Sequence, residues 1–364
     1  MRIAITGSRG IPNNYGGFEQ CAENLAVLLA EAGHEVTVYN PDYHNFTNDD
    51  YRGVRIVRKW NPEKKTGTAG NFIYDYLCMS HALSEKCDIL LVLGYTTASV
   101  FFPFLRKRKS ILVTNMDGLE WKRDKWNSLV KKLAKWFESL GARYSDYLIS
   151  DNREIRNYLL REYKTDSTFI AYGAEIFDQP DESILAQYQL VAGQYDLLIA
   201  RLEKENNIET ILDGIVLAAG STPFLVIGKH ETAYGKYLQQ KYASTPTIRF
   251  MGGIYNMNHL NNLRWFGRYY FHGHSVGGTN PSLLEAMASG AYILSHNNLF
   301  NRDVLGDQCW YFSNPEEVAT LLADTARLES TRKTYIAAQR EKIIQNYNWK
   351  KIAGEYEELF LKIV

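Results

Sequence analysis

The sequence predicts an α/β protein built from two doubly wound halves, each with a parallel sheet. The chain has 364 residues, about twice the length of one ordinary domain. Short apolar segments alternate with helix-length segments in two successive series, and a stretch without clear periodicity near residues 172–192 separates them. Such alternation is typical of parallel sheets whose two faces are covered by helices.

The first series begins at residues 2–6, which are mostly apolar and end at Gly7. An amphipathic helix is expected from Phe18 to Ala32, because its apolar face ends at Gly33, a common residue after a helix. The uncharged run at 89–105 is interpreted as a buried strand followed by a helix. The further strands expected in this half are HEVTVYN, VRIVRKW, CDILLVLG, SILVTN and DYLIS.

The second series starts at residues 195–200 and continues through PFLVIG, TIRFMG, RYYFHG and AYILSH. After Asn314 we expect only helices, over residues 315–327, 330–347 and 349–362. The predicted domains are therefore residues 1–172 and 173–345, with residues 346–364 packing back on the first domain. Because ligands bind at the carboxyl ends of parallel strands, we also expect the two halves to face each other across a cleft, with C-terminal helices crossing between them.

Composition excludes several classes of function. Lysine plus arginine equals aspartate plus glutamate at 41 each, so the chain has no overall positive field to hold a nucleic acid, and none is expected as a partner. The four cysteines form no CxxC pair, which fits a reducing compartment. The N-terminus has no apolar stretch long enough for an export signal, so a cytoplasmic location is expected.

A glycine-rich loop at residues 7–19 precedes the first predicted helix. The N-terminus of a helix favours an anion, so this loop is a candidate phosphate site. It is not the dinucleotide fingerprint GxGxxG, because Arg9 and Pro12 occupy positions that need small residues. The alternative is a wide turn whose glycines supply positive φ angles.

A second glycine loop, within residues 271–290, also leads from a strand into a helix. Thr279, Asn280 and Ser282 can present backbone N–H groups to a phosphate, and Glu285, one turn into the helix, can accept hydrogen bonds from ribose hydroxyls. The alternative for Glu285 is a solvated helix carboxylate. His272 and His274 are expected to point to opposite faces, so no metal pair is predicted.

The segment HSVGGTNPSLLEAMASG resembles the sugar-nucleotide motif of the family 4 glycosyltransferases, which have the GT-B fold of two facing Rossmann-like domains. Three more segments match in the expected order along nearly the whole chain. They are YGGFE for the N-terminal glycine loop, ARLEKENNIETILDGI for the start of the second domain and VTNMDGLEWKRDKW for the catalytic loop. The combination is most similar to a bacterial subgroup described as rhamnosyltransferases of polysaccharide synthesis.

The resemblance implies roles for individual donor-site residues. The diphosphate-binding arginine of the family falls on Arg201 and the ribose-binding glutamate on Glu285. The lysine that accompanies the arginine falls on Asn206, so Lys204 is expected to replace it. The YGGFE match adds Gly16 and Gly17 to the donor-binding set.

Two positions depart further from the family pattern. A glutamate that contacts the donor sugar falls on Gly277, so His274 or the amide of Gly278 is expected to compensate. The catalytic histidine aligns with Asp117, which would orient the acceptor hydroxyl or remove its proton. The resemblance implies a retaining reaction, although Asp117 leaves an inverting one open. No DxD triplet occurs, so we expect neither a metal nor a cofactor beside the nucleotide-sugar substrate.

Basic residues interleaved with tryptophans crowd into a short part of the first half. Such a face attracts anionic lipid headgroups and predicts peripheral attachment to the inner surface of the plasma membrane. The alternative is an ordinary solvated helix surface. The residues expected to contribute are Arg106, Lys107, Arg108, Lys109, Lys122, Arg123, Lys131 and Lys132.

We therefore expect a glycosyltransferase that moves a sugar, in the first instance rhamnose from dTDP-rhamnose, to a polysaccharide or lipid-linked acceptor. Three alternatives stay open. One is a catalytically silent module that binds sugar nucleotides, which the residues at Gly277 and Asn206 favour. The others are a nucleotide-sugar epimerase and, least favoured, a nicotinamide-dependent oxidoreductase.

Overall fold

The computed structural model describes residues 1–364 except 14–15, 106–107, 117 and 124–125. Contacts between Cα atoms divide the chain into two compact units. Unit 1 comprises Met1–Trp121, Trp126–Gly173 and Trp349–Val364, and unit 2 comprises Lys122–Lys125 and Ala174–Asn348. The last residues of the chain thus return to the unit in which it begins.

The described residues of unit 1 form one sheet of eight strands in the order β3-β4-β2-β1-β5-β6-β7-β8. Neighbouring strands are parallel except β3 and β4, which pair as a short antiparallel edge. The strands are β1 (Arg2–Thr6), β2 (Glu35–Pro41), β3 (Asp50–Tyr51), β4 (Val54–Lys59), β5 (Ile89–Leu93), β6 (Ile111–Asn115), β7 (Tyr147–Ser150) and β8 (Thr168–Phe169). Every residue of β5 is buried, which confirms the interpretation of the uncharged run at 89–105 as a buried strand.

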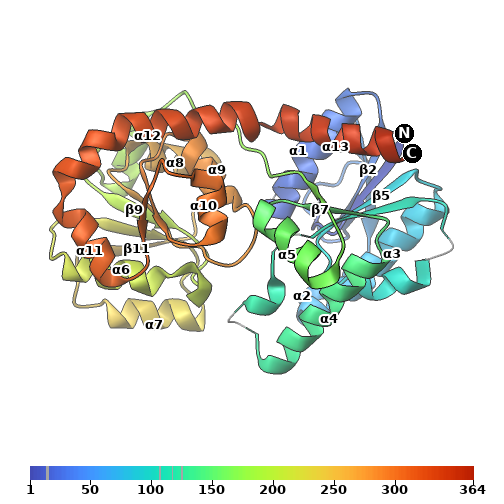
Figure 1. Ribbon diagram of the computed structural model, residues 1–364, viewed down its shortest axis with the longest axis horizontal. Coiled ribbons are helices and arrows are strands. Elements are labelled where there is room, and N and C mark those ends of the chain that lie inside the picture. The colour runs from blue at the N-terminus through green and yellow to red at the C-terminus, as the bar shows by residue number, and fades with distance from the viewer. Residues whose placement is uncertain (14–15, 106–107, 117, 124–125) are drawn as a thin grey trace. The chain divides into compact units, whose positions relative to one another are not determined.

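Helices cover the sheet of unit 1, and α13 lies against α1, so both ends of the chain belong to this unit (Figure 1). The apolar faces of α3 and η2 complete one core cluster with β1 and β5, including Tyr74, Leu90 and Phe102. The helices are α1 (Gly17–Glu31), α2 (Glu63–Thr66), α3 (Gly70–Ser84), α4 (Ser128–Tyr144), α5 (Arg153–Tyr163) and α13 (Trp349–Ile363), with the 3₁₀ turns η1 (Gly67–Ala69), η2 (Ser99–Leu105) and η3 (Glu120–Lys122).

Unit 2 has a six-stranded sheet in its described residues, in the order β11-β10-β9-β12-β13-β14, and all neighbours are parallel. Its strands are β9 (Asp196–Ile199), β10 (Phe224–Ile227), β11 (Ile248–Gly252), β12 (Tyr270–His272), β13 (Ile293–His296) and β14 (Trp310–Phe312). The predicted fold class, two Rossmann-like halves with parallel sheets, is therefore confirmed. The edge strands β3, β8 and β14 are too short to give a hydrophobic pattern and are absent from the sequence prediction.

Helices pack on both faces of the second sheet, and the apolar side chains of α6 and α11 meet β10 and β12 in one core. The predicted helices after Asn314 are present, but the first break falls at Asp324, whose side chain caps α12. The helices are α6 (Ile208–Leu217), α7 (Ala233–Lys241), α8 (Met257–Phe266), α9 (Pro281–Ala288), α10 (Leu299–Leu305), α11 (Pro315–Ala323) and α12 (Thr325–Asn346), with η4 (Glu182–Tyr188) and η5 (Lys204–Asn206).

In each sheet the strand order reverses between two central strands. The reversal lies between β1 and β5 in unit 1 and between β9 and β12 in unit 2. The loops that follow these strands leave in opposite directions, and this opens the crevice at which doubly wound sheets bind ligands. The described residues include no helix long and apolar enough to cross a membrane.

Candidate functional site

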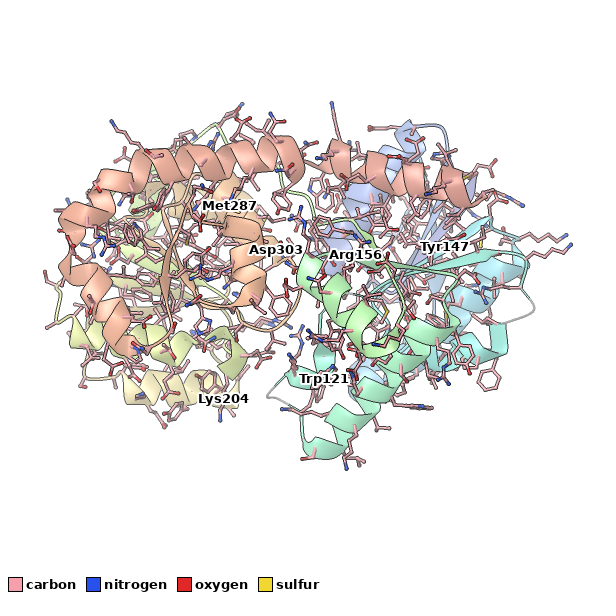
Figure 2. All side chains as sticks on the ribbon, viewed as in Figure 1. Trp121, Tyr147, Arg156, Lys204, Met287 and Asp303 are labelled. Carbon is pink, nitrogen blue, oxygen red and sulfur yellow. The ribbon has the colours of Figure 1, made fainter. Side chains whose placement is uncertain are left out.

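The segment after β9 brings two exposed cations to the point of reversal in unit 2. The side chain of Arg201 is 65% exposed and makes one weak contact, 4.0 Å to Glu203. Lys204, labelled in Figure 2, is also exposed in η5. Asn206 is buried, and its amide donates to the carbonyl of Arg201 at 2.7 Å. Asn206 therefore shapes the turn that carries Arg201.

The glycine loop after β12 packs directly on this turn. A Cβ atom on Gly273 would lie 2.1 Å from the carbonyl oxygen of Asn206, so only glycine allows the backbones to come so close. Ser275 donates from both its backbone N–H and its hydroxyl to the carbonyl of Glu205, at 3.1 and 2.8 Å. The two loops are thus tied together, and Arg201 and His274 belong to one site.

The prediction that His272 and His274 point to opposite faces is wrong. Their rings stack with centroids 4.6 Å apart and planes 17° apart, because side chains two residues apart in an extended chain lie on the same face. Burial lowers the pKa of His274 to about 3, with a further contribution from the charge of Arg201. Burial also lowers the pKa of His272 well below its usual value. Both rings are therefore neutral at pH 7.

Asn298 and Asn301 hold the backbone at His274. Their side-chain amides donate to the carbonyl oxygen of His274 at 3.0 and 2.9 Å. The ring of His272 is 99% buried, and neither of its nitrogens has a hydrogen-bond partner among the described residues. His272 therefore acts on the site through stacking against His274.

Two predicted donor-binding residues at the start of α9, Asn280 and Ser282, form side-chain hydrogen bonds within the protein. Asn280 caps the helix, because its side-chain oxygen accepts from the N–H of Ser282 at 3.0 Å. The hydroxyl of Ser282 bonds to that of Tyr270 at 3.0 Å and points into the unit. Thr279 is buried, and Gly278 lies in the same loop. A ligand at this helix start would meet backbone N–H groups rather than these side chains.

Glu285 does not have the solvated environment of an ordinary surface carboxylate. Its Oε2 accepts from Arg264 at 2.6 Å, and its side chain is 16% exposed. Arg264 comes from α8, is 1% exposed, and also donates to Asn261 and Ser282. This pair holds Glu285 in one orientation and leaves its Oε1 without a protein partner in the described part of the chain. Sequence reasoning missed Arg264, since nothing local marks an arginine in an amphipathic helix as buried.

The glycines predicted from the first loop, Gly16 and Gly17, lie in unit 1, and Gly16 is the residue before α1. The carboxylate of Glu19 lies over this helix start, where it accepts from the N–H of Arg9 at 2.7 Å. The guanidinium of Arg9 is paired with Glu63. The helix start in unit 1 is therefore already next to a protein anion, whereas no acidic side chain occurs in the first turn of α9.

The predicted catalytic residue, Asp117, lies outside the described residues, as do Arg106 and Lys107 of the predicted basic face. Two further members of that face are not free surface cations, and here the prediction is wrong. The side chain of Arg108 is 6% exposed and pairs with Asp146 at 2.5 Å. Arg123 is 18% exposed and lies 3.7 Å from Glu203. Lys109, Lys122 and Lys132 are exposed, and Lys131 is half-buried.

Replacing Arg264 by methionine should destabilise the protein by about 3 kcal/mol, because one partner of a buried ion pair is left without the other. Chemical denaturation in urea measures this loss. Arg156→Met is the matched control, since Arg156 pairs with Asp166 at the surface, where the loss should be below about 1 kcal/mol. Equal losses in the two variants would show that the Arg264–Glu285 pair is not a special restraint.

Residues 1–175 match the model of a domain of unknown function, DUF1972. None of the curated proteins matches the sequence.

Solved structures match the whole chain. Sucrose-phosphate synthase from Thermosynechococcus elongatus superposes with a TM-score of 0.80 at 16% identity, covering 100% of this chain and 98% of that one. HepE from Anabaena in complex with UDP-glucose gives 0.75 at 13% identity, with 100% and 99% covered. A glycosyltransferase from Rickettsia africae gives 0.74 at 12%, with 100% and 98% covered. The fold of this chain is therefore that of the GT-B glycosyltransferases.

Proposed function

We propose that this protein is a glycosyltransferase that moves a sugar from a nucleoside diphosphate to a saccharide or lipid-linked acceptor. One observation carries the proposal. At the reversal point of unit 2, two exposed cations, a glycine loop and a helix start gather beside a fixed carboxylate, Glu285. These are the groups needed for a diphosphate and a ribose at the carboxyl edge of a parallel sheet. The complex of HepE with UDP-glucose, a protein of the same fold, supports the proposal.

Each group has a distinct task in this reaction. Arg201 and Lys204 neutralise the diphosphate and stabilise it as it leaves, together with the N–H groups of Gly278 and Thr279. Glu285 accepts from the ribose hydroxyls through its free Oε1. His274, being neutral, offers the donor sugar a hydrogen bond without adding charge. The protein thereby supplies position and electrostatic field for the transfer.

The finer assignments rest on the sequence resemblance. Rhamnose from dTDP-rhamnose is the proposed donor, with retention of anomeric configuration. The absence of a DxD triplet in the sequence favours a reaction without a divalent metal. Asp117 is the proposed group at the acceptor hydroxyl.

Donor recognition can be tested by thermal shift with dTDP, UDP, GDP, ADP and NAD, each with and without EDTA, because a ligand of the folded state raises Tm. We expect one nucleoside diphosphate to raise Tm selectively, with or without EDTA. Glu285→Ala should weaken the affinity of the protein for this nucleoside diphosphate roughly 10- to 100-fold, which is the range for a hydrogen bond to a charged group.

Glu316→Ala is the matched control, because Glu316 is an exposed carboxylate in the first turn of α11. Its affinity should equal that of the wild type. A shift with NAD alone would contradict the proposal and favour the oxidoreductase alternative. Donor binding without transfer to any acceptor would favour the silent binding module.

Asp117→Asn should lower the rate of sugar transfer roughly 100-fold or more, since general acid–base catalysis contributes about 10²–10⁴. The amide keeps the shape of the side chain but takes up no proton. Donor affinity should be unchanged, as Asp117 is assigned to the acceptor. Initial rates and isothermal titration measure the two effects. An unchanged rate would remove Asp117 from the mechanism.

Attachment of unit 1 to an anionic membrane is a second part of the proposal, carried by the surface that α3, η2 and α4 form together. These elements pack side by side, with Phe72 of α3 against Phe137 of α4 and Tyr76 of α3 against Phe101 of η2. Large apolar side chains remain exposed on them, which we call the apolar face. Its members are Ile73, Tyr76, Phe104, Leu129, Leu133 and Trp136.

The exposed charged side chains on α3, η2 and α4 are positive. The acidic residues of α3 and α4 are Asp75 and Glu138, and both are buried. Lys132 and Arg143 of α4 are exposed. A surface with protruding phenylalanine, leucine and tryptophan, and with positive but no negative side chains on these elements, complements a lipid bilayer that carries anionic headgroups. The proposed attachment site therefore consists of the apolar face and the exposed lysine and arginine near it, and it does not include Arg108 or Arg123.

The combined variant Leu133→Gln, Trp136→Gln should bind vesicles of equal parts phosphatidylglycerol and phosphatidylcholine at least roughly tenfold more weakly than the wild type, because buried apolar area is lost. Sedimentation measures the binding. Leu160→Gln is the control, as Leu160 is an exposed apolar residue on α5, outside the apolar face. Equal binding by the combined variant and the wild type would contradict the attachment site.

A further inference from the structure

A buried carboxylate in unit 1 gathers polar side chains from several elements. Glu138 of α4 is 1% exposed. Its Oε1 accepts from Tyr158 at 2.5 Å and from Tyr163 at 2.6 Å, one in the middle and one at the end of α5. Its Oε2 accepts from the indole N–H of Trp121 at 3.1 Å and from the hydroxyl of Tyr95 at 3.3 Å. These aromatic side chains thus supply four hydrogen-bond donors to this carboxylate, two to each oxygen.

Lys135, one turn before Glu138, completes the cluster. Its ammonium group lies 3.1 Å from Oε1 of Glu138 and 3.0 Å from Glu162. The same group lies 4.7–5.0 Å from the ring centroids of Trp121, Tyr158 and Tyr163. Glu138 therefore lies beside a cation that it shares with Glu162, and three of the rings that donate to Glu138 also line this cation.

The cluster fixes the loop after β6 at several points. Trp121, labelled in Figure 2, belongs to this loop and bonds directly to Glu138. The hydroxyl of Tyr95 also approaches the carbonyl of Gly118, at 3.4 Å. One turn further along α4, a Cβ on Gly141 would lie 3.2 Å from the sulfur of Met116, so glycine lets the helix pack closely on the loop.

A need for stability does not explain such a cluster, since apolar residues of similar volume would often stabilise a core equally well. Directional hydrogen bonds instead specify one arrangement of the groups that make them. Burial and the bond to Glu138 raise the pKa of Tyr158 to about 12, so it remains a donor throughout the neutral range. The loop held in this way follows a strand at the carboxyl edge of the sheet, where ligands of such sheets bind.

We infer that Glu138 is a positioning residue for sugar transfer. It acts through Trp121 and Tyr95 to fix the segment Gly118–Trp121 on the acceptor side of the reaction. The inference rests on the proposed function, because it takes this loop to contribute to transfer. Glu138 touches neither donor nor acceptor in this role, and its effect is confined to the geometry of the loop.

The test compares the wild type with Glu138→Gln and with Tyr163→Phe, which removes one donor and leaves the carboxylate in place. Asp196→Asn is the matched control, because Asp196 is a buried carboxylate of unit 2 that pairs with Arg268 at 2.6 Å. Two readouts are taken on the full chain: hydrogen–deuterium exchange of the peptide that covers 118–122, and the kinetics of sugar transfer.

We expect Glu138→Gln to raise exchange in this peptide and to lower kcat at least tenfold, with the affinity for the nucleoside diphosphate unchanged. Tyr163→Phe should show the same pattern to a smaller degree. Asp196→Asn should lower Tm without altering exchange at 118–122. A double-mutant cycle with Trp121→Phe should be non-additive in kcat, since both changes act through one bond.

Unchanged exchange at 118–122 in both Glu138→Gln and Tyr163→Phe would overturn the inference, as would additive effects in the cycle. A merely structural role would lower Tm and donor affinity together in Glu138→Gln, and this too would overturn it. If the wild type transfers no sugar from any donor, the proposed function fails. The exchange data then still decide whether Glu138 fixes the loop.

Discussion

The close approach of two chain segments where the strand order reverses is the constraint on which both units depend. In unit 1, Gly7 follows β1, and a Cβ there would lie 2.3 Å from the carbonyl oxygen of Leu93 on β5. In unit 2, Gly273 follows β12, and a Cβ there would lie 2.1 Å from the carbonyl oxygen of Asn206, beyond the end of β9. Any side chain at either glycine would push the neighbouring segments apart. The loops that carry Arg201 and His274 therefore depend on one absent methyl group for their proximity.

Much of this architecture could be predicted from the sequence, because parallel strands that are buried on both faces leave apolar runs of the right length. The glycine loop before Pro281 and the helix after it were equally visible. The contacts made by the ends of long polar side chains could not be predicted from the sequence. Arg264 and Glu285 are 21 residues apart on different helices, and only the packing of α8 on α9 brings them together. Asn206 stands where the sequence resemblance leads one to expect a lysine, yet its amide bonds to the protein backbone.

Two predictions are wrong for different physical reasons, one local and one that depends on the fold. The prediction that the two histidines face opposite sides neglects the two-residue period of an extended chain, which places side chains i and i+2 on one face. The basic run around Arg108 predicts a surface cation, but Asp146, 38 residues further on, pairs with it. A run of basic residues in the sequence predicts a positively charged surface only when the fold brings no acidic side chains into contact with those residues. The apolar face shows the converse, because Asp75 and Glu138 lie in the same helices but point inward.

The charges of unit 2 are paired at one end of the strands β9 and β12 and exposed at the other. At the amino ends of β9 and β12, Asp196 and Arg268 form a two-pronged pair, with bonds of 2.9 and 2.6 Å that satisfy both partners. At the carboxyl ends, Arg201 is 65% exposed with one weak contact. The charges are therefore paired with each other at one edge of the sheet, and a cation is exposed to solvent at the other. Because the whole chain is neutral, attraction of an anion to this edge depends on local charges such as Arg201 and Lys204. Neutral His274 beside them places a ring with hydrogen-bonding nitrogens at this edge without adding charge.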